Sequence, residues 1–164
     1  MSGFRAFIIV IATLAGIAGL ARPDDGSRTH AVDGLITKPS AYSVDVTLDR
    51  LERALKERGF MIFARLDHAA AAASVGLKMP RATVLVFGNP RVGTPNFIKY
   101  PTLAIDLPVK ALVWEDASGK VWLSYNTQKY LNDSAYARHG APIDEELTNR
   151  IDGLFATVTD AATK

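Results

Sequence analysis

The sequence predicts one small α+β domain built on an antiparallel sheet that helices cover on one side. Three observations lead to this fold class. Strand-like and helix-like segments follow one another in mixed order, one pair of strands has a clear hairpin signal, and two longer segments have the apolar spacing of amphipathic helices. With 164 residues, the chain has room for one domain with a self-sufficient core. We expect a signal peptide over residues 1–21, a flexible lead-in over 22–33 and a single domain over 34–164.

Residues 1–21 have the composition of a cleavable export signal. Arg5 supplies a positive charge, and the apolar stretch over 6–17 is too short to span a bilayer comfortably. Gly19 and Ala21 are the small residues that signal peptidase requires, so we expect cleavage after Ala21 and a periplasmic or secreted protein. The chain would then meet the membrane only through this segment, before cleavage. The alternative is an uncleaved membrane anchor, which the small residues near the end of the segment disfavour.

The clearest helix is predicted over residues 43–58. Its apolar residues recur at spacings of three and four and form one stripe: Val44, Leu48, Leu51 and Leu55. Ser43 is a suitable N-cap, and Gly59 is the expected C-terminal stop. We expect strands on either side of this helix, over 34–38 and 60–66.

Shorter elements follow along the chain. The alanine-rich run after Asp67 and His68 is helix-prone and ends at Gly76. In chain order, the next segments are a buried strand (83–87), a turn (88–90), a short helix opened by Thr94 and Pro95, and a segment that is ambiguous between extended and helical conformations (103–107).

The strongest hairpin signal comes from predicted strands over 110–115 and 120–125. Gly119 lies in their connecting loop, at a position suited to the left-handed backbone of a type I turn with a bulge. Trp114 and Trp122 lie on these strands, and we expect both to be part of the core.

Two helices are expected after the hairpin. Thr127 caps the first, which ends at His139 and Gly140, and we interpret His139 as a cation that complements this helix end. Pro142 is expected to start the last helix. The apolar residues of that helix share one face: Ile143, Leu147, Ile151, Leu154, Phe155 and Val158.

Charge and composition exclude several classes of function. The formal net charge is +2, and acidic side chains are interleaved with the basic ones, so the one-signed patch of a nucleic-acid binder is missing. The absence of cysteine excludes disulfides, thiol nucleophiles and cysteine zinc sites. Three scattered histidines form no metal-binding pattern, the identity of any metal stays open, and no cofactor is predicted.

Several short motifs occur in a characteristic order: Leu66-Asp67-His68-Ala69, Phe87-Gly88-Asn89-Pro90, Ile105-Asp106-Leu107-Pro108, Trp114-Glu115-Asp116 with Gly119, and Ser124-Tyr125. Together they resemble the bacterial family known as domain of unknown function 302, over about residues 43–139. The resemblance implies an α+β fold similar to the TATA-binding-protein class and a homodimer, and it implies no activity. Val46 stands where related sequences often carry glutamate, so Ser43 would cap its helix without a capping box.

Asp67 and His68 are the candidate catalytic pair, because they fall at the end of a predicted strand. His68 could act as a general base or as a metal ligand, with Asp67 or Asp106 orienting its ring. The structural alternative is that Asp67 caps the alanine-rich helix and His68 occupies its first turn. Both readings remain open at the level of sequence.

The other candidate ligand-binding residues are Asn89, Arg91, Asp106 and Tyr125. Residues 88–94 nearly match a P-loop but lack its lysine, so the surviving reading is that Arg91 holds a carboxylate or phosphate beside a helix N-terminus. Plain turn and cap roles compete with this reading. Asp106 suits acid/base chemistry, a metal or a turn cap, and Tyr125 closes a strand near the same mouth.

These patterns favour a non-enzymatic module that binds a small ligand or a metal as a homodimer, in a pocket near His68, Asn89 and Asp106. One alternative is a small enzyme that uses Asp67 and His68 for acid/base chemistry, although the sequence names no nucleophile for it. Another is a structural or protein-interaction module in which the histidine has no chemical role.

Overall fold

A computed structural model describes residues 32–164 as a five-stranded antiparallel sheet with accompanying helices. The strands are β1 (Leu35–Pro39), β2 (Met61–Asp67), β3 (Ala82–Gly88), β4 (Val109–Glu115) and β5 (Val121–Asn126). The helices are α1 (Val44–Lys56), α2 (His68–Ser74), α3 (Pro90–Lys99), α4 (Gln128–Leu131) and α5 (Glu145–Thr163). Shorter helical segments are η1 (Pro101–Ile105), η2 (Asn132–Tyr136) and η3 (Ala137–His139). The predicted signal peptide (1–21), nearly all of the lead-in (22–33) and His30 lie outside the described residues.

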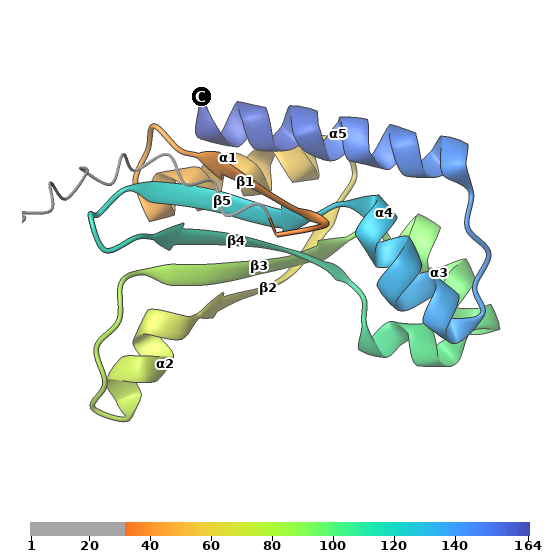
Figure 1. Cartoon of the computed structure of the whole chain (residues 1–164), viewed down its shortest axis with the longest axis horizontal. Helices are drawn as coiled ribbons and strands as arrows, with labels where there is room; N and C mark the ends of the chain where they lie inside the picture. The colour runs from red at the N-terminus through yellow and green to blue at the C-terminus, as the bar shows by residue number, and fades with distance from the viewer. Residues whose placement is uncertain (1–31) are drawn as a thin grey trace, which may run out of the picture.

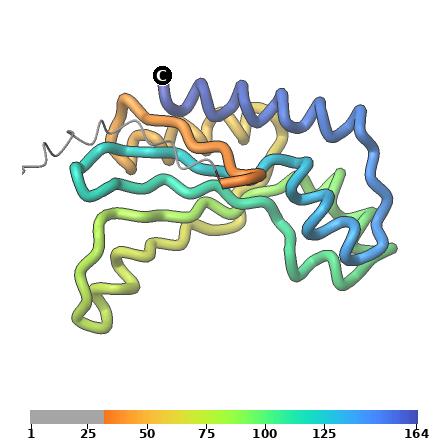
Figure 2. Tube along the Cα trace, in the orientation of Figure 1, coloured from red at the N-terminus to blue at the C-terminus, as the bar shows by residue number. Residues whose placement is uncertain are grey.

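The strand order is β1-β5-β4-β3-β2, so the first strand of the domain pairs with the last. Helices α1 and α5 lie on one face of this sheet, while α3, η1 and α4 gather beyond one end of it (Figure 1). The connection through α2 descends on the side of the sheet away from α5 (Figure 2). The predicted fold class, α+β with a sheet covered on one side, is confirmed.

Helix α1 forms for the reasons that its sequence indicates. The Ser43 side chain caps it by accepting a hydrogen bond from the backbone N–H of Val46. The apolar stripe faces the sheet, and its members are almost fully buried: Val44, Leu48, Leu51 and Leu55. The expected cap and the expected buried face are therefore both present.

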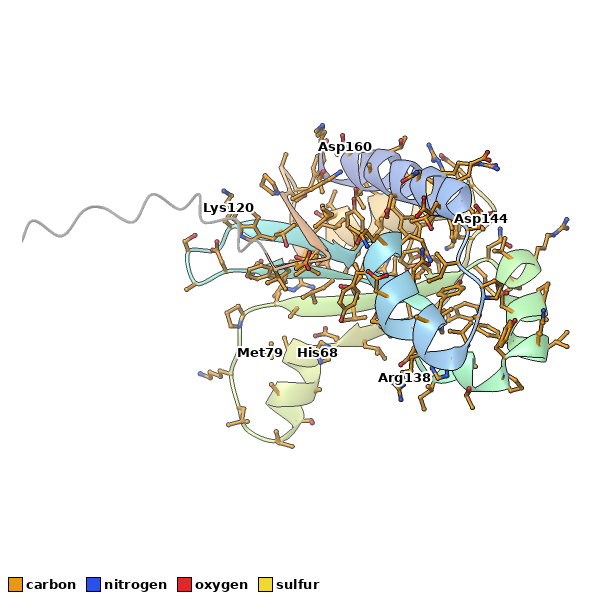
Figure 3. The ribbon with its side chains drawn as sticks, turned by 45° about the vertical axis from the view of Figure 1, so that its right-hand side comes forward. His68, Met79, Lys120, Arg138, Asp144 and Asp160 are labelled. Carbon is orange, nitrogen blue, oxygen red and sulfur yellow. The ribbon has the colours of Figure 1, made fainter. Side chains whose placement is uncertain are left out.

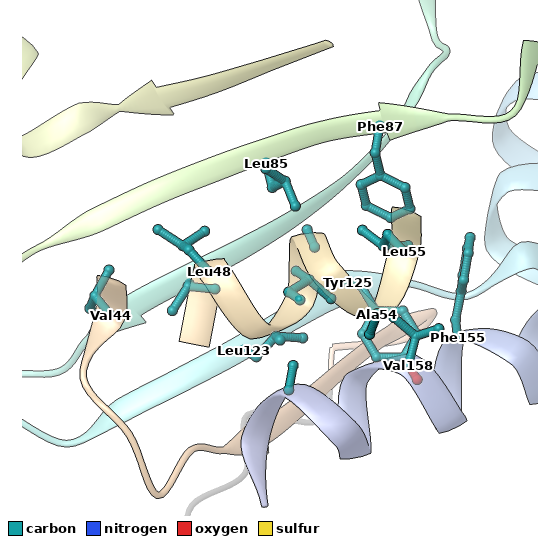
Figure 4. Packing of buried hydrophobic residues seen from close by; sticks show 14 of the residues in the cluster. Val44, Leu48, Ala54, Leu55, Leu85, Phe87, Leu123, Tyr125, Phe155 and Val158 are labelled. Carbon is teal, nitrogen blue, oxygen red and sulfur yellow. The ribbon is translucent and has the colours of Figure 1, made fainter. Parts of the chain in front are cut away.

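The core lies between the sheet and the two long helices (Figure 4). Alternate strand residues point into it, for example Leu85 on β3 and Leu123 on β5. The ring of Phe155, on α5, packs against those of Phe87 and Tyr125, with ring centroids 5.8 and 6.2 Å away. Burial of these rings holds α5 on the sheet.

The opposite face of the sheet has no long helix over it. Leu66, Val84 and Leu112 occupy one row across β2, β3 and β4, in alternation with residues of the core. Trp114 and Trp122 stack on each other, with ring centroids 6.2 Å apart. Trp122 is buried, as predicted, whereas Trp114 is only partly buried, and both lie on this uncovered face rather than in the cluster between sheet and helices.

Two predicted helix starts were also wrong. Helix α3 begins at Pro90, after the N-cap Asn89, and Pro95 lies inside it instead of starting it. An Asn followed by Pro suits a helix start as well as it suits a turn, since proline loses nothing at the first helical position. Helix α5 begins at Glu145, because the Asp144 carboxylate accepts a hydrogen bond from the N–H of Leu147 and caps the helix there.

The ambiguous and composite segments are helical in the structure. Residues 101–105 form the 3₁₀ segment η1. The helix capped by Thr127 runs through α4, a π-helical turn (η2) and a 3₁₀ turn (η3), and it ends at Gly140 with φ +67°. The predicted start and stop of this helix are confirmed, although it is not one regular α-helix.

Candidate functional site

Strand pairing places the predicted site residues at two opposite ends of the sheet. Met61 pairs with Gly88 at one end, here called the Met61 end, and Asp67 pairs with Thr83 at the other, the Asp67 end. The ends are six residues apart, and a strand rises roughly 3.3 Å per residue, so about 20 Å separates them. His68 follows the Asp67 end, whereas Asn89 follows the Met61 end. The sheet therefore keeps these two residues apart.

At the Asp67 end, the side chain of Asp67 serves to cap a helix. Asp67 accepts a hydrogen bond of 2.9 Å from the backbone N–H of Ala70 and so caps α2. His68 is exposed in the first turn of this helix, on the side of the sheet away from α5 (Figure 3). Asp106 does not orient the His68 ring, because its carboxylate bonds to His139 instead.

An open groove lies at the Met61 end, where the last turns of α1, the start of β2 and the start of α3 meet. It encloses about 670 Å³. Its lining residues are Glu52, Lys56, Gly59, Phe60, Met61, Ile62, Asn89, Pro90 and Arg91. Two of the residues predicted to bind a ligand, Asn89 and Arg91, thus lie in the same groove, which has an apolar floor and a charged rim.

Two charged residues of the groove rim, Glu52 and Arg91, differ in whether an oppositely charged side chain pairs with them. Partial burial raises the pKa of Glu52, but hydrogen bonds from Arg65 and Lys56 outweigh that effect and hold the pKa below its ordinary value. Glu52 is therefore an ionised and neutralised part of the wall. Within residues 32–164, no ion pair engages the guanidinium of Arg91.

Asn89 shapes this groove through its cap. Its side-chain oxygen accepts a hydrogen bond of 3.0 Å from the N–H of Arg91, which fixes the start of α3 beside the first residues of β2. The side-chain oxygen is thus committed to the helix terminus, while the amide NH2 keeps its two donors. Arg91 is the residue of this pair whose charged group is available to a ligand.

Asp106 and Tyr125 line a second, much smaller space. This cavity of about 60 Å³ lies between the sheet and the helices, next to Pro108, Lys110 and Asn126, and it has room for only a few water molecules. Tyr125 belongs to the core, and burial raises the pKa of its phenol while a hydrogen bond with Thr159 acts in the opposite direction. The cavity is too small for an organic ligand.

Asp106 also takes part in a chain of three polar side chains that the sequence did not suggest. Its Oδ2 lies 2.8 Å from His139 Nε2, and His139 Nδ1 lies 2.9 Å from Thr102 Oγ1. Arg138 Nη1 lies 3.5 Å from the same carboxylate oxygen. His139 was interpreted as a helix-end cation, but its imidazole joins η3 to η1 instead.

The sequence did not connect the other lining residues with this groove, among them Lys56, Phe60, Met61 and Ile62. Lys56 was correctly expected in a helix and Met61 and Ile62 in a strand, whereas Phe60 lies just before β2; nothing in the local pattern brings these residues next to Asn89. Only the pairing of β2 with β3 does so, with Met61 opposite Gly88. His139 was missed for a similar reason, because its partners precede it by more than thirty residues.

Within 32–164, no group of three or more His, Asp or Glu side chains is arranged to hold a metal ion. In the same range, no helix has the length and apolar character needed to cross a membrane.

The fold and the groove define the chain as a small one-sided α+β domain with a ligand-sized depression at one end of its sheet. A family model described as Domain of unknown function DUF302 matches residues 36–158, which is most of the chain. The chain belongs to this family, as the resemblance predicted. The structure of an uncharacterized conserved DUF302 protein from Bacillus stearothermophilus is similar, with a TM-score of 0.67 at 19% identity, over 80% of this chain and 99% of that one. At this identity the likeness concerns the fold alone.

Three Brucella proteins are similar in sequence. Fluoride-specific ion channel FluC 1 of Brucella suis biovar 1 (strain 1330) is 43% identical over 98 residues, which cover 60% of this chain and 39% of the channel. FluC 1 of Brucella abortus biovar 1 (strain 9-941) and FluC 2 of Brucella melitensis biotype 1 (strain ATCC 23456) have the same identity, with 36% of their length covered. The chain thus matches well under half of each of these relatives.

Proposed function

We propose that the groove of this domain is a non-enzymatic binding site for a small amphipathic carboxylate, an apolar chain or ring that carries one anionic group. The observation that supports this function best is the groove at the Met61 end, which combines an apolar floor with the guanidinium of Arg91. Its volume of about 670 Å³ falls within the range of roughly 300–1,000 Å³ that is usual for small-molecule sites.

The floor of the groove favours an apolar ligand body. Phe60 precedes β2, and Met61 and Ile62 are its first two residues; Phe60 and Ile62 also pack against the core, while the Met61 side chain is half exposed. Covering these side chains with an apolar group removes them from water, which favours binding by about 25 cal/mol per Å².

The charges of the rim favour an anionic head group. The rim carries Lys56 and Arg91 with one carboxylate, Glu52, which is already hydrogen-bonded to both Arg65 and Lys56. The positive charge of Arg91 lies in the first turn of α3, where the helix dipole adds to its attraction for an anion. A guanidinium binds a carboxylate through two parallel hydrogen bonds, so Arg91 is the residue we expect to hold the head group.

Decanoate and decanol test this function as a matched pair of probes that differ in the anionic group. In isothermal titration calorimetry we expect saturable binding of decanoate and much weaker binding of decanol. Arg91→Gln should weaken decanoate binding about tenfold or more, because a hydrogen bond to a charged group contributes roughly 1.5–3 kcal/mol. Lys129→Gln removes another exposed cation, on α4, which does not line the groove, and should leave the affinity unchanged.

Either of two results would contradict the proposal that this groove binds an amphipathic carboxylate. One is equal affinity of the wild type and Arg91→Gln for decanoate. The other is equal affinity of the wild type for the acid and the alcohol, which would leave only unspecific apolar adsorption.

A homodimer is the assembly we propose, through the uncovered face of the sheet. Phe63 and Leu66 on β2 are about half exposed, and Leu66 continues into the apolar row with Val84 and Leu112. An exposed apolar surface on a sheet indicates an interaction site. The occupant we propose is a second copy of this chain, since the family resemblance implies a homodimer and a two-fold interface needs only one self-complementary surface.

Native mass spectrometry of Leu66→Asp tests this assembly. The buried charge should convert a dimer of the wild type into a monomer, while Leu147→Asp on α5, which is similarly exposed, should remain dimeric. A monomeric wild type at micromolar concentration, or a dimeric Leu66→Asp, would reject this surface.

The names of the Brucella relatives support a second candidate function, in which the domain acts together with a membrane anion channel. The fluoride-specific ion channel FluC 1 of Brucella suis is 43% identical to this chain over 98 residues, so we propose that the domain accompanies such a channel. Deleting the gene in its host should then raise sensitivity to sodium fluoride, and the wild-type gene should restore growth. Unchanged growth at all fluoride concentrations would reject this candidate.

Export remains part of the proposal for the protein in its cell. The composition of residues 1–21 supports a mature chain that starts at Arg22 in the periplasm or medium. N-terminal sequencing of the protein from fractionated host cells would test this, and an intact Met1 in the cytoplasmic fraction would contradict it.

A further inference from the structure

The chain Thr102–His139–Asp106 has the connectivity of an activated hydroxyl nucleophile, and it is distinct from the groove. Asp106 is an acceptor-only carboxylate, so the nitrogen 2.8 Å away, His139 Nε2, carries the shared proton. In the neutral imidazole, Nδ1 is then an acceptor, and the Thr102 hydroxyl 2.9 Å away donates to it. A hydroxyl hydrogen-bonded to a base, with that base oriented by a third group, is the pattern of nucleophilic catalysis.

The surroundings of the three groups fit these roles. The His139 side chain is only 8% exposed, so its two hydrogen bonds hold the ring in one orientation. Thr102 is exposed on η1, so its hydroxyl is accessible to a molecule from solution. Arg138 places a positive charge 3.5 Å from the Asp106 oxygen that bonds to the ring.

The position of the chain in the fold supports the same reading. Thr102 lies in the 3₁₀ turn η1 and Asp106 caps its C-terminal end, and Leu103 between them is fully buried against Ala135 and Ala141. This small cluster packs η1 against the segment that carries His139, which fixes the distance between base and hydroxyl. The three side chains are thus held by buried packing and not by surface loops.

We propose that Thr102 is an acyl-accepting nucleophile, with His139 as its general base and Asp106 as the residue that positions His139. Thr102 Oγ1 forms a bond to the carbonyl carbon of an activated ester while its proton passes to His139 Nδ1. The bond from that carbon to the leaving oxygen breaks, and the leaving alkoxide or phenoxide takes up the proton. The products are an acylated Thr102 and a free alcohol or phenol.

p-Nitrophenyl acetate is the probe, with peptide mass spectrometry to locate the acetyl group and p-nitrophenolate absorbance to give the rate. We expect acetylation of Thr102 in the full-length protein. Thr157 provides an internal control, because its hydroxyl is also exposed but donates to the carbonyl of Gly153, with no base beside it. It should remain unmodified under the same conditions.

Variants separate the chemistry from the fold. Thr102→Val keeps the shape and should abolish the label, whereas Thr102→Ser should retain it. His139→Gln should slow acetylation about 10²-fold, the lower range for general-base catalysis. Asp106→Asn tests the same chain if His139→Gln fails to fold, and it should also slow the reaction because the orienting carboxylate is lost.

Three results would overturn the proposal. They are acetylation confined to lysines, equal labelling of Thr102 and Thr157, and an unchanged rate in a folded His139→Gln or Asp106→Asn variant. Circular dichroism melting of each variant checks that it is folded.

Discussion

Gly34 joins the start of β1 to α4 through a backbone conformation that other residues rarely adopt. Its φ is +74°, and a Cβ at this position would lie 2.5 Å from the Cβ of Tyr130. The carbonyl of Gly34 also accepts a hydrogen bond of 2.8 Å from the N–H of Thr127, at the cap of α4. A single residue without a side chain therefore lets the first strand contact the helix that follows the last strand.

Gly34→Ala is expected to destabilise the protein more than Gly76→Ala. Both positions have positive φ, which costs alanine about 1–2 kcal/mol. Only Gly34 adds a steric clash, because nothing lies within 4 Å of a Cβ at Gly76, and overpacking typically adds about 1–3 kcal/mol. Urea unfolding of the two variants measures the difference, and equal losses would contradict the close contact with Tyr130.

The Asp116 carboxylate has an unusually low pKa for its position in a hairpin loop. Hydrogen bonds from the Ser118 side chain, then from the Trp122 indole, lower its pKa to about 2. The folded-state pKa lies below the unfolded value of about 3.9, so this group stabilises the fold at higher pH and loses that effect as pH falls from about 4 toward 2. Urea unfolding of wild type and Asp116→Asn across this range should show the two stabilities converging. A constant difference would contradict the bonds to Asp116.

Arg50 attaches the end of α5 to α1. Its guanidinium donates hydrogen bonds of 2.7 and 2.8 Å to the carbonyls of Ala161 and Lys164, and it lies 4.2 Å from the Tyr42 ring centroid. These carbonyls have no partner within the helix, so a side chain from another element satisfies them. The contact fixes the last turn of the long helix.

Arg50→Met should therefore loosen the end of α5 without unfolding the domain. We expect faster amide hydrogen exchange over the last turn of α5 and unchanged exchange in β4 and β5, because the core does not depend on Arg50. Arg53→Met, on the same helix, is the control. Equal exchange in both variants would show that the guanidinium does not hold the helix end.

Most elements could be predicted because their signals are local. The stripe of α1, its cap Ser43 and the turn at Gly119, where φ is +82°, depend on residues close together in sequence. The start of α3 was missed because Asn followed by Pro is equally compatible with a turn and a cap, and the choice depends on what the next residues contact. The prediction of a helix boundary failed where two local conformations were equally compatible with the sequence.

At the scale of the molecule, a main core and a small satellite cluster have separate positions. Leu123 belongs to the main core, whereas Leu103 packs with Ala135 and Ala141 beyond the Met61 end. Both leucines are fully buried. The satellite carries the Thr102–His139–Asp106 chain, so its local stability matters to that site.

Leu103→Ala should destabilise only part of the domain, whereas Leu123→Ala should destabilise all of it. Truncating a buried leucine costs about 2–5 kcal/mol. Leu123→Ala should lower the melting temperature of the whole domain, while Leu103→Ala should mainly accelerate hydrogen exchange in η1 and η3. Uniform acceleration across the sheet in Leu103→Ala would show that the two clusters unfold as one.

The candidate sites could be predicted only in part, because they depend on contacts between distant residues. Arg91 and Asn89 were recognised from a local glycine- and proline-rich motif, and the structure places them in one groove. His68 was grouped with them from its position at a strand end, yet the register of β2 and β3 puts it about 20 Å away. Strand order and register are global properties, and one sequence does not contain them in readable form.

The position of α5 has a consequence for how the chain acquires its structure during synthesis. Phe155 and Val158 cover core residues contributed by α1 and the strands, so a nascent chain that stops before residue 145 leaves those residues in water. Such a chain cannot complete its core, and it exposes apolar side chains that chaperones bind. Folding of this domain therefore waits for its final helix, and a ribosome-bound intermediate would remain sensitive to protease until that helix has emerged.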